Sequence, residues 1–167
     1  LVRCVETAQP LSERLGLPIR EEPGLLEVDY GEWRGGELKE LSKKPEWQLV
    51  QMYPSGFRFP GGETLREVQS RVVETLERIR SEHEGEAIAL FAHGDILRTT
   101  LAWYLGAPLD LFQRIVISTA SVSVLGFHHF GPRVLLVNET GEIPQVRWEA
   151  DKSDKEKEIP AETAKAN

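Results

Sequence analysis

The order of patterns between residues 64 and 104 constrains the fold of this chain more than any other feature of its sequence. Thr64 and Glu67 match a capping box, and the apolar stripe that follows predicts a helix. Residues 87–92, AIALFA, form a continuous apolar run that is typical of a strand covered on both faces. After His93 the apolar spacing is again helical. A helix, a buried strand and a second helix predict an α/β sheet with helices on both faces.

The segments on either side add three further expectations. Residues 1–15 have helical spacing and predict a helix, bent near Pro10, and residues 38–53 predict a less regular helical stretch. Residues 25–36 mix acidic, apolar and glycine residues with neither period, which predicts an irregular loop.

Two β-rich runs follow the second helix of the central pattern. They occupy residues 115–127 and 133–140, and we expect them to add two strands to the same sheet. The length of 167 residues, 40% of them hydrophobic, suits one domain, which we assign to residues 1–148. Residues 149–167 are strongly polar, and we expect them to be a disordered tail.

Charge and cysteine content exclude several classes of partner. A net charge of -7 repels a phosphodiester backbone, so nucleic acid is not an expected ligand. The single cysteine, Cys4, rules out an internal disulfide and fits a reducing compartment. No apolar run approaches the roughly 20 residues that span a bilayer. We therefore expect a cytoplasmic protein with no membrane partner, and we leave open whether it forms a homo-oligomer.

His93 occupies the position where α/β proteins bind ligands, at the carboxyl end of the predicted strand. Gly94 and Asp95 open the next helix, whose first backbone N–H groups attract anions. This position suits a phosphate or a carboxylate. Taken alone, the tripeptide is equally compatible with a histidine that caps a strand and hydrogen-bonds to a neighbouring loop.

Two other segments carry candidate charges. Glu27 lies in the irregular stretch, and a carboxyl group held near a bound anion keeps its proton and can act as a general acid. Arg3 can clamp a phosphate with two hydrogen bonds if the start of its helix faces the site. Read separately, the acidic loop and the arginine are better explained as solvated charges.

Four motifs follow one another in the order of a known family. They are R-x-x-x-T-A at residues 3–8, L-x-E-x-x-x-G-x-W-x-G at 25–35, P-G-G-E-T at 60–64 and A-H-G-D at 92–95. With these motifs the sequence resembles the histidine phosphatase superfamily, the phosphoglycerate mutase-like group, over about residues 1–140. The stretches FQRIV, ASVSVL and VNETG look like a bacterial branch of probable phosphomutases or phosphatases. The resemblance implies a three-layer α/β/α sandwich.

The resemblance also implies catalytic roles for three residues. In this family a neutral imidazole attacks phosphorus to give a phosphohistidine, which is then hydrolysed or passed to an acceptor. Arg3 matches the second arginine of the phosphoryl site. Glu27 matches the carboxyl group that protonates the leaving oxygen. His93 matches the second histidine, which donates a hydrogen bond to the phosphoryl oxygens.

Substrate binding is implied for three neighbours of these residues. Gly94 and Asp95 line the same pocket, with Asp95 standing where mutases often have asparagine. Tyr30 matches a position that mutases use for substrate contact. No metal and no organic cofactor is implied.

One departure from the family pattern is large. The family's nucleophile lies in an Arg-His-Gly motif at the end of the first strand, and the sequence contains no Arg-His-Gly. We therefore expect the nucleophile, its arginine and the central strand of the sheet to lie upstream of Leu1. On this interpretation the domain is N-terminally truncated, the sheet lacks its first strand and the chain alone is inactive.

The expected function is that of a phosphoric monoester hydrolase acting on a small phosphorylated metabolite. A phosphoglycerate mutase-like phosphomutase is the alternative within the same class. Residues 37–59 offer few cations for a second substrate phosphate, which favours hydrolysis; these are Lys39, Lys43, Lys44 and Arg58. A non-catalytic domain that binds a phosphate ligand is the alternative of another class, supported by the missing histidine motif.

Overall fold

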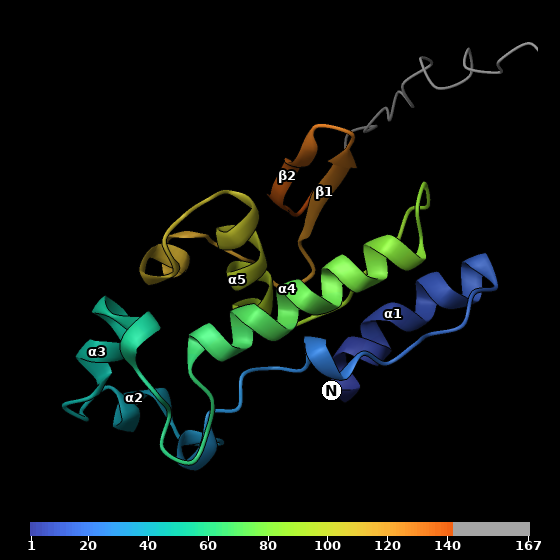
Figure 1. Cartoon of the computed structure of the whole chain (residues 1–167). Coiled ribbons are helices and arrows are strands. Elements are labelled where there is room, and N and C mark those ends of the chain that lie inside the picture. Colours follow the sequence, from blue (N-terminus) through green and yellow to red (C-terminus); the bar gives the residue numbers. More distant parts are fainter. Residues whose placement is uncertain (142–167) are drawn as a thin grey trace, which may run out of the picture.

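The structure, a computed structural model, describes residues 1–141 and combines helices with a two-stranded sheet (Figure 1). The longer helices are α1 Val2–Leu15, α4 Leu65–Glu82 and α5 Gly94–Tyr104. The short ones are α2 Leu38–Leu41 and α3 Trp47–Met52. The strands are β1 Val122–His128 and β2 Gly131–Glu139. The tail predicted at residues 149–167 lies outside the described residues.

Helix α4 runs through the middle of the molecule, with α2 and α3 beyond its N-terminal end (Figure 1). The predicted capping box is confirmed: the Thr64 hydroxyl accepts the N–H of Glu67, and the Glu67 carboxylate accepts the N–H of Thr64. The predicted apolar stripe is buried; it consists of Leu65, Val68, Val72, Leu76 and Ile79. All of them except Ile79 belong to the main hydrophobic core, together with Ile96 and Ala102 of α5.

Aromatic side chains extend the core towards α2 and α3. Trp33 is buried, and its ring lies 5.6 Å from that of Phe59 and 6.3 Å from that of Trp47. The predicted irregular loop at residues 25–36 has only short turns of 3₁₀ helix, at Pro23–Leu25 and Gly31–Trp33. Burial of Trp33 fixes this loop against the domain without regular secondary structure.

The prediction of a buried strand at residues 87–92 is wrong for the described part of the chain. These residues form no strand there, and Ile88 and Leu90 are 43% and 40% exposed. A β-strand exists only where its N–H and C=O groups pair with a neighbour. Within residues 1–141 no segment pairs with this one, so its apolar side chains stay uncovered.

The two β-rich runs form their own sheet, so the prediction that they join residues 87–92 is also wrong for the described chain. β1 and β2 pair antiparallel, with Leu125 opposite Val134 and His128 opposite Gly131. The sheet that residues 1–141 form has these two strands and no other. A tight hairpin needs only local contacts, whereas a parallel strand needs a separate partner.

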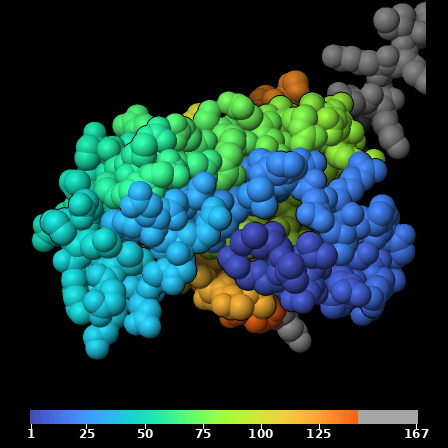
Figure 2. All heavy atoms as spheres, turned by 90° about the horizontal axis from the view of Figure 1, so that it is seen from below, coloured from blue at the N-terminus to red at the C-terminus, as the bar shows by residue number. Residues whose placement is uncertain are grey.

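Helix α1 confirms the prediction for residues 1–15, with Pro10 inside it and Gly16 ending it at a φ of 67°. Its apolar face is poorly covered: Ala8 is its only buried residue, while Leu11 and Leu15 are exposed. The space-filling view shows this N-terminal part, in blue, beside the green of α4 (Figure 2). The described helices include none that is long and apolar enough to cross a membrane.

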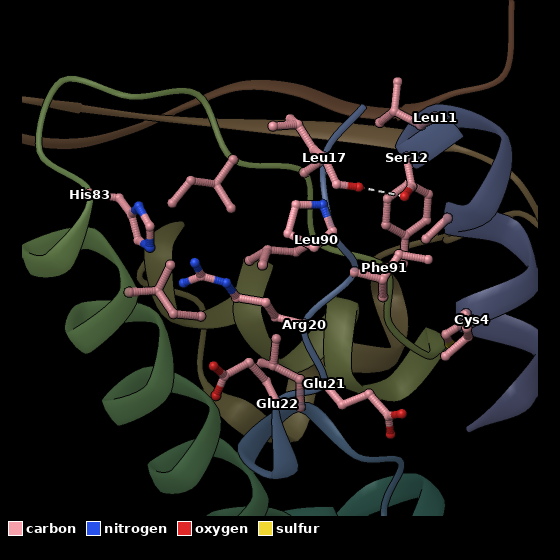
Figure 3. A pocket seen from close by; sticks show the side chains of 18 of the residues that line it. Cys4, Leu11, Ser12, Leu17, Arg20, Glu21, Glu22, His83, Leu90 and Phe91 are labelled. Carbon is pink, nitrogen blue, oxygen red and sulfur yellow. Dashed lines mark hydrogen bonds between the residues drawn. The ribbon is translucent and has the colours of Figure 1, made fainter. Parts of the chain in front are cut away.

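A wide groove, which we call the α1 groove, separates α1 from residues 87–91 (Figure 3). Its volume is about 570 Å³, and residues 17–26 close one side. Leu90 and Phe91, from the segment at residues 87–92, face the groove, and Cys4 of α1 lies on its other side. His93 is among the residues that line the groove, so this uncovered apolar surface adjoins the predicted catalytic histidine.

Candidate active site

His93 is the residue that precedes α5, and its extended backbone lets the chain turn from residues 87–92 into the helix. The residue is only 4% exposed although its neighbours in residues 87–90 are exposed. Gly94 and Asp95 form the first turn of α5, where N–H groups have no acceptor within the helix. His93 therefore lies beside a group of backbone donors that favours an anion.

Arg3 lies against His93, 90 residues away in the chain. Its guanidinium nitrogen is 2.7 Å from His93 Nδ1, and because a guanidinium only donates, Nδ1 is the acceptor. Burial, together with the positive charge of Arg3, lowers the pKa of His93. The imidazole is thus neutral with its proton on Nε2, and this N–H is available to a ligand. The neighbour of Nε2 is the Cys4 Sγ, 3.5 Å away, a weak acceptor.

Glu27 is the third member of this cluster. Its Oε2 lies 3.7 Å from the Arg3 guanidinium and 3.6 Å from His93 Nδ1. Burial raises the pKa of Glu27, and the nearby charge of Asp95 raises it further. The N–H of Val28 and the Arg3 charge oppose this shift without cancelling it. A carboxyl group with a raised pKa beside an anion site is suited to proton donation.

The other two predicted substrate-binding side chains are joined to each other. The Tyr30 hydroxyl donates to Asp95 Oδ2 at 2.8 Å, and Arg98 donates to Asp95 Oδ1 at 2.8 Å. Burial and the Asp95 carboxylate raise the pKa of Tyr30, so its hydroxyl stays protonated. The structure thus adds Arg98, which the sequence analysis did not single out.

A second cavity of about 570 Å³ adjoins this chain of hydrogen bonds, and we call it the aromatic pocket. Tyr30, Asp95 and Arg98 all line it, and two of them, Tyr30 and Asp95, interact with the charge of Glu27. Its other walls come from the 25–36 loop, α2, α3 and neighbouring residues; among them are Trp33, Leu38, Leu41, Trp47, Phe59 and Phe112.

Two glycine motifs have a structural explanation. Gly31 has a φ of 53°, and a Cβ there would lie 2.0 Å from the carbonyl oxygen of Pro60. A Cβ on Gly62 would lie 2.2 Å from the carbonyl oxygen of Asp29. The loops therefore pack backbone against backbone, with the Glu32 N–H donating to Pro60. The P-G-G-E-T turn supports the loop that carries Tyr30.

An ion pair between Arg71 of α4 and Glu63, two residues before the start of that helix, holds the loop that carries Glu27. Arg71 donates to both carboxylate oxygens of Glu63, to the Gly24 carbonyl at 2.7 Å and to the Glu27 carbonyl at 3.3 Å. Glu63 in turn accepts the N–H of Asp29 at 2.9 Å. Burial opposes the ionisation of Glu63, but the hydrogen bonds from Arg71 and Asp29 lower its pKa. Sequence reasoning missed this clamp because it joins residues from separate elements.

We expect Arg71→Met to displace Glu27 without touching the phosphoryl site. Loss of the Arg71 guanidinium leaves the half-buried Glu63 without a cation. We expect this to lower the free energy of unfolding by about 1–3 kcal/mol. In a catalytically active form of the protein, kcat for alkyl phosphates should fall roughly tenfold because a small misplacement of an acid is costly. Denaturant unfolding and steady-state kinetics measure both effects.

The matched control is Arg78→Met, which removes a more exposed guanidinium from the same helix. Its kcat should stay within about twofold of the wild type, because surface substitutions of this kind have small effects. Equal losses in the two variants would show that Arg71 has no special part in placing Glu27.

Comparison with known proteins places these residues in a family. A family model described as the histidine phosphatase superfamily, branch 1, matches residues 1–140. The chain belongs to this superfamily. None of the described residues forms a cluster of three or more His, Cys, Asp or Glu side chains that could hold a metal ion.

Curated members of the superfamily with similar sequences include phosphatases and a mutase. Phosphoserine phosphatase 1 of Hydrogenobacter thermophilus is 28% identical over 163 residues, which cover 92% of this chain and 74% of that protein. The probable phosphoglycerate mutase GpmB of Cronobacter sakazakii is 31% identical over 126 residues, 74% of this chain and 58% of that protein. The chain spans only 39% of a bifunctional protein of Mycobacterium tuberculosis.

The fold agrees with that of solved members of the superfamily. A mycobacterial glucosyl-3-phosphoglycerate phosphatase in complex with inorganic phosphate superposes with a TM-score of 0.70 at 26% sequence identity. The match covers 82% of this chain and 72% of that one. The predicted class, an α/β fold of the phosphoglycerate mutase-like kind, is therefore confirmed. The roles of Arg3, Glu27 and His93 stay predictions from their geometry.

Proposed function

We propose that this chain provides the phosphoryl-binding and proton-transfer groups of a phosphoric monoester hydrolase that acts through a phosphohistidine on a small phosphorylated metabolite. The observation that carries the proposal is the meeting of a cation, a neutral imidazole and a protonatable carboxyl group. Arg3, His93 and Glu27 come from three separate elements and lie within 3.7 Å of one another. His93 is buried, Glu27 is largely covered, and both have a pKa shifted by burial and by a charged neighbour, a combination that is common at functional sites.

In the proposed site the phosphoryl group binds between Arg3 and the start of α5. The N–H groups of Arg3 that do not point at His93 bind phosphoryl oxygens, as guanidinium groups commonly do. His93 donates its Nε2–H to a further oxygen in place of the weak contact with the Cys4 sulfur. Because His93 is buried, its N–H is held in position to stabilise the charge that develops on the phosphoryl oxygens in the transition state.

Glu27 handles the protons in both chemical steps. When an imidazole attacks phosphorus, the bond to the ester oxygen breaks and Glu27 gives its proton to the leaving alcohol. Water then attacks the phosphohistidine, Glu27 takes a proton from that water, and inorganic phosphate leaves. The attacking imidazole belongs to the Arg-His-Gly motif that the resemblance implies, and residues 1–167 contain no such motif. The 167-residue chain alone should therefore bind phosphate esters without turning them over.

Hydrolysis fits the aromatic pocket better than transfer to a second phosphorylated substrate. None of the four basic residues in positions 37–59 lines this pocket, and the two arginines that do, Arg34 and Arg98, are each hydrogen-bonded to a carboxylate. A phosphomutase must hold the free phosphate of its acceptor, which needs such cations. The similarity to a probable phosphoglycerate mutase keeps transfer as the second candidate.

Trapping the intermediate tests the proposed function. A catalytically active form of the protein is mixed with radiolabelled p-nitrophenyl phosphate and denatured within milliseconds. We expect a protein-bound label that is stable in alkali and lost in acid, as an N–P bond requires, and inorganic phosphate as the product. An alkali-labile label would overturn the proposal in favour of an ester or acyl phosphate. Tight phosphate binding with no turnover in any form of the protein would favour a non-catalytic binding domain.

A further inference from the structure

The structure also points to the kind of alcohol that the substrate carries. We propose that the aromatic pocket receives the leaving alcohol and that this alcohol is flat and apolar, such as an aryl group. The inference rests on the proposed function and adds the substrate class.

The position of the pocket follows from residues that it shares with the phosphoryl site. Tyr30 and Asp95 both line it and are joined by a hydrogen bond, and Asp95 directly follows His93 and Gly94 in the chain. Both side chains lie near enough to Glu27 to interact with its charge. Glu27 must reach the oxygen that joins phosphorus to the alcohol. The alcohol on that oxygen therefore has the aromatic pocket beside it.

The walls of the pocket are rings held by the core. Phe59 contacts Tyr30 edge-on with ring centres 5.0 Å apart, and Trp33 and Trp47 are stacked with 19° between their planes. Trp33 and Phe59 are 7% and 4% exposed, so their positions are fixed by packing rather than by a ligand. A preformed cavity with aromatic walls binds flat apolar groups with little loss of entropy.

The charges in the lining argue against an alcohol that carries a second anion. The Arg34 guanidinium donates to Asp29 at 2.8 Å, and that of Arg98 donates to Asp95 at the same distance. Both cations of the lining are thus already paired with carboxylates. The other polar lining residues are the neutral Gln51 and Gln113 and the hydroxyl of Tyr30. An anionic or strongly hydrated alcohol would lose water here without gaining a free cation.

Leu38 offers a substitution that alters the pocket without disturbing the core. It lines the pocket from α2 and is 72% exposed, so Leu38→Glu should fold normally. Met52→Glu is the matched control, because Met52 is 79% exposed on α3 and does not line the pocket. Both variants add the same charge to the protein, so a difference between them reports on the pocket.

Binding of two phosphonates that cannot be hydrolysed tests the inference. Calorimetric titration compares 1-naphthylmethylphosphonate with 3-hydroxypropylphosphonate, two anions that differ in the organic group. We expect the naphthyl compound to bind at least about tenfold more tightly, because only its rings bury apolar surface. The ratio of the two affinities should fall several-fold in Leu38→Glu and stay unchanged in Met52→Glu.

A third titration, with 1-naphthylmethanol, separates failure of this inference from failure of the proposed function. If both phosphonates bind equally well, the alcohol class is wrong while the proposed function stands. If the naphthyl alcohol binds as tightly as its phosphonate, the phosphonate group finds no site, and both proposals fall. An equal loss of the affinity ratio in the two glutamate variants also overturns the inference.

Discussion

Replacing His93 by alanine is expected to lower kcat/KM for an aryl phosphate by about 10²–10³-fold in a catalytically active form of the protein. The variant loses the Nε2–H that the proposed site directs at the phosphoryl oxygens. It also loses the acceptor that holds the Arg3 guanidinium at 2.7 Å. Because the pKa of His93 is lowered by burial and by Arg3, the wild-type imidazole is a neutral donor at and above neutral pH. Steady-state kinetics with p-nitrophenyl phosphate measure the loss.

Two further variants separate catalysis from folding. His129→Ala removes an exposed imidazole from the turn between β1 and β2, and it should retain wild-type activity. His93→Gln keeps a side-chain N–H donor and should recover part of the rate. Circular dichroism should show the same helical content in all three variants. Wild-type-like turnover by His93→Ala would refute its assignment to the phosphoryl site.

Glu27→Gln should slow substrates according to the basicity of their leaving groups. An alkoxide must be protonated as it leaves, so we expect alkyl phosphates to react about 10²–10⁴-fold more slowly. A p-nitrophenolate leaves without a proton, so the phosphorylation step for this ester should change by less than about threefold. The measurement is a plot of log kcat/KM against the pKa of the leaving alcohol, which should be steeper for the variant. Parallel plots for the two proteins would count against a general acid.

The pH profile gives the same prediction an independent test. Burial and Asp95 raise the pKa of Glu27, so the acid form extends to higher pH than in a solvated glutamate. For alkyl phosphates, kcat/KM should fall as pH rises through this raised pKa, because the proton donor is lost. Glu27→Gln should abolish this fall of kcat/KM at high pH. Glu32→Gln, an exposed neighbour in the same loop, is the control and should keep it.

The sequence predicts the helices well because their signals are local. The capping box at Thr64 and the stripe on α4 involve residues a few positions apart, and the structure confirms both. The helix after His93 and the irregular loop around Trp33 are confirmed for the same reason. Neighbours in the chain carry all of this information.

The strand at residues 87–92 shows where local patterns fail. Its apolar run is a true signal of β-propensity, but strand formation depends on a partner elsewhere in the chain. No described residue supplies one, so Ile88 and Leu90 face the α1 groove or solvent instead of a covered sheet. The same limit applies to β1 and β2. Their local sequence predicts two strands correctly, but it does not show that they pair with each other in a separate sheet.

For the candidate site, the residue types and the family could be predicted from the amino-acid order, because the four motifs follow one another within residues 1–140. Which charged side chains meet depends on the packing of the chain. Arg3 and Glu27 reach His93 because α1 and the 25–36 loop pack beside the start of α5. The clamp of Arg71 on that loop and the pairing of Arg98 with Asp95 were likewise invisible in the sequence. Electrostatic interactions depend on distance and burial, which the linear order of residues does not contain.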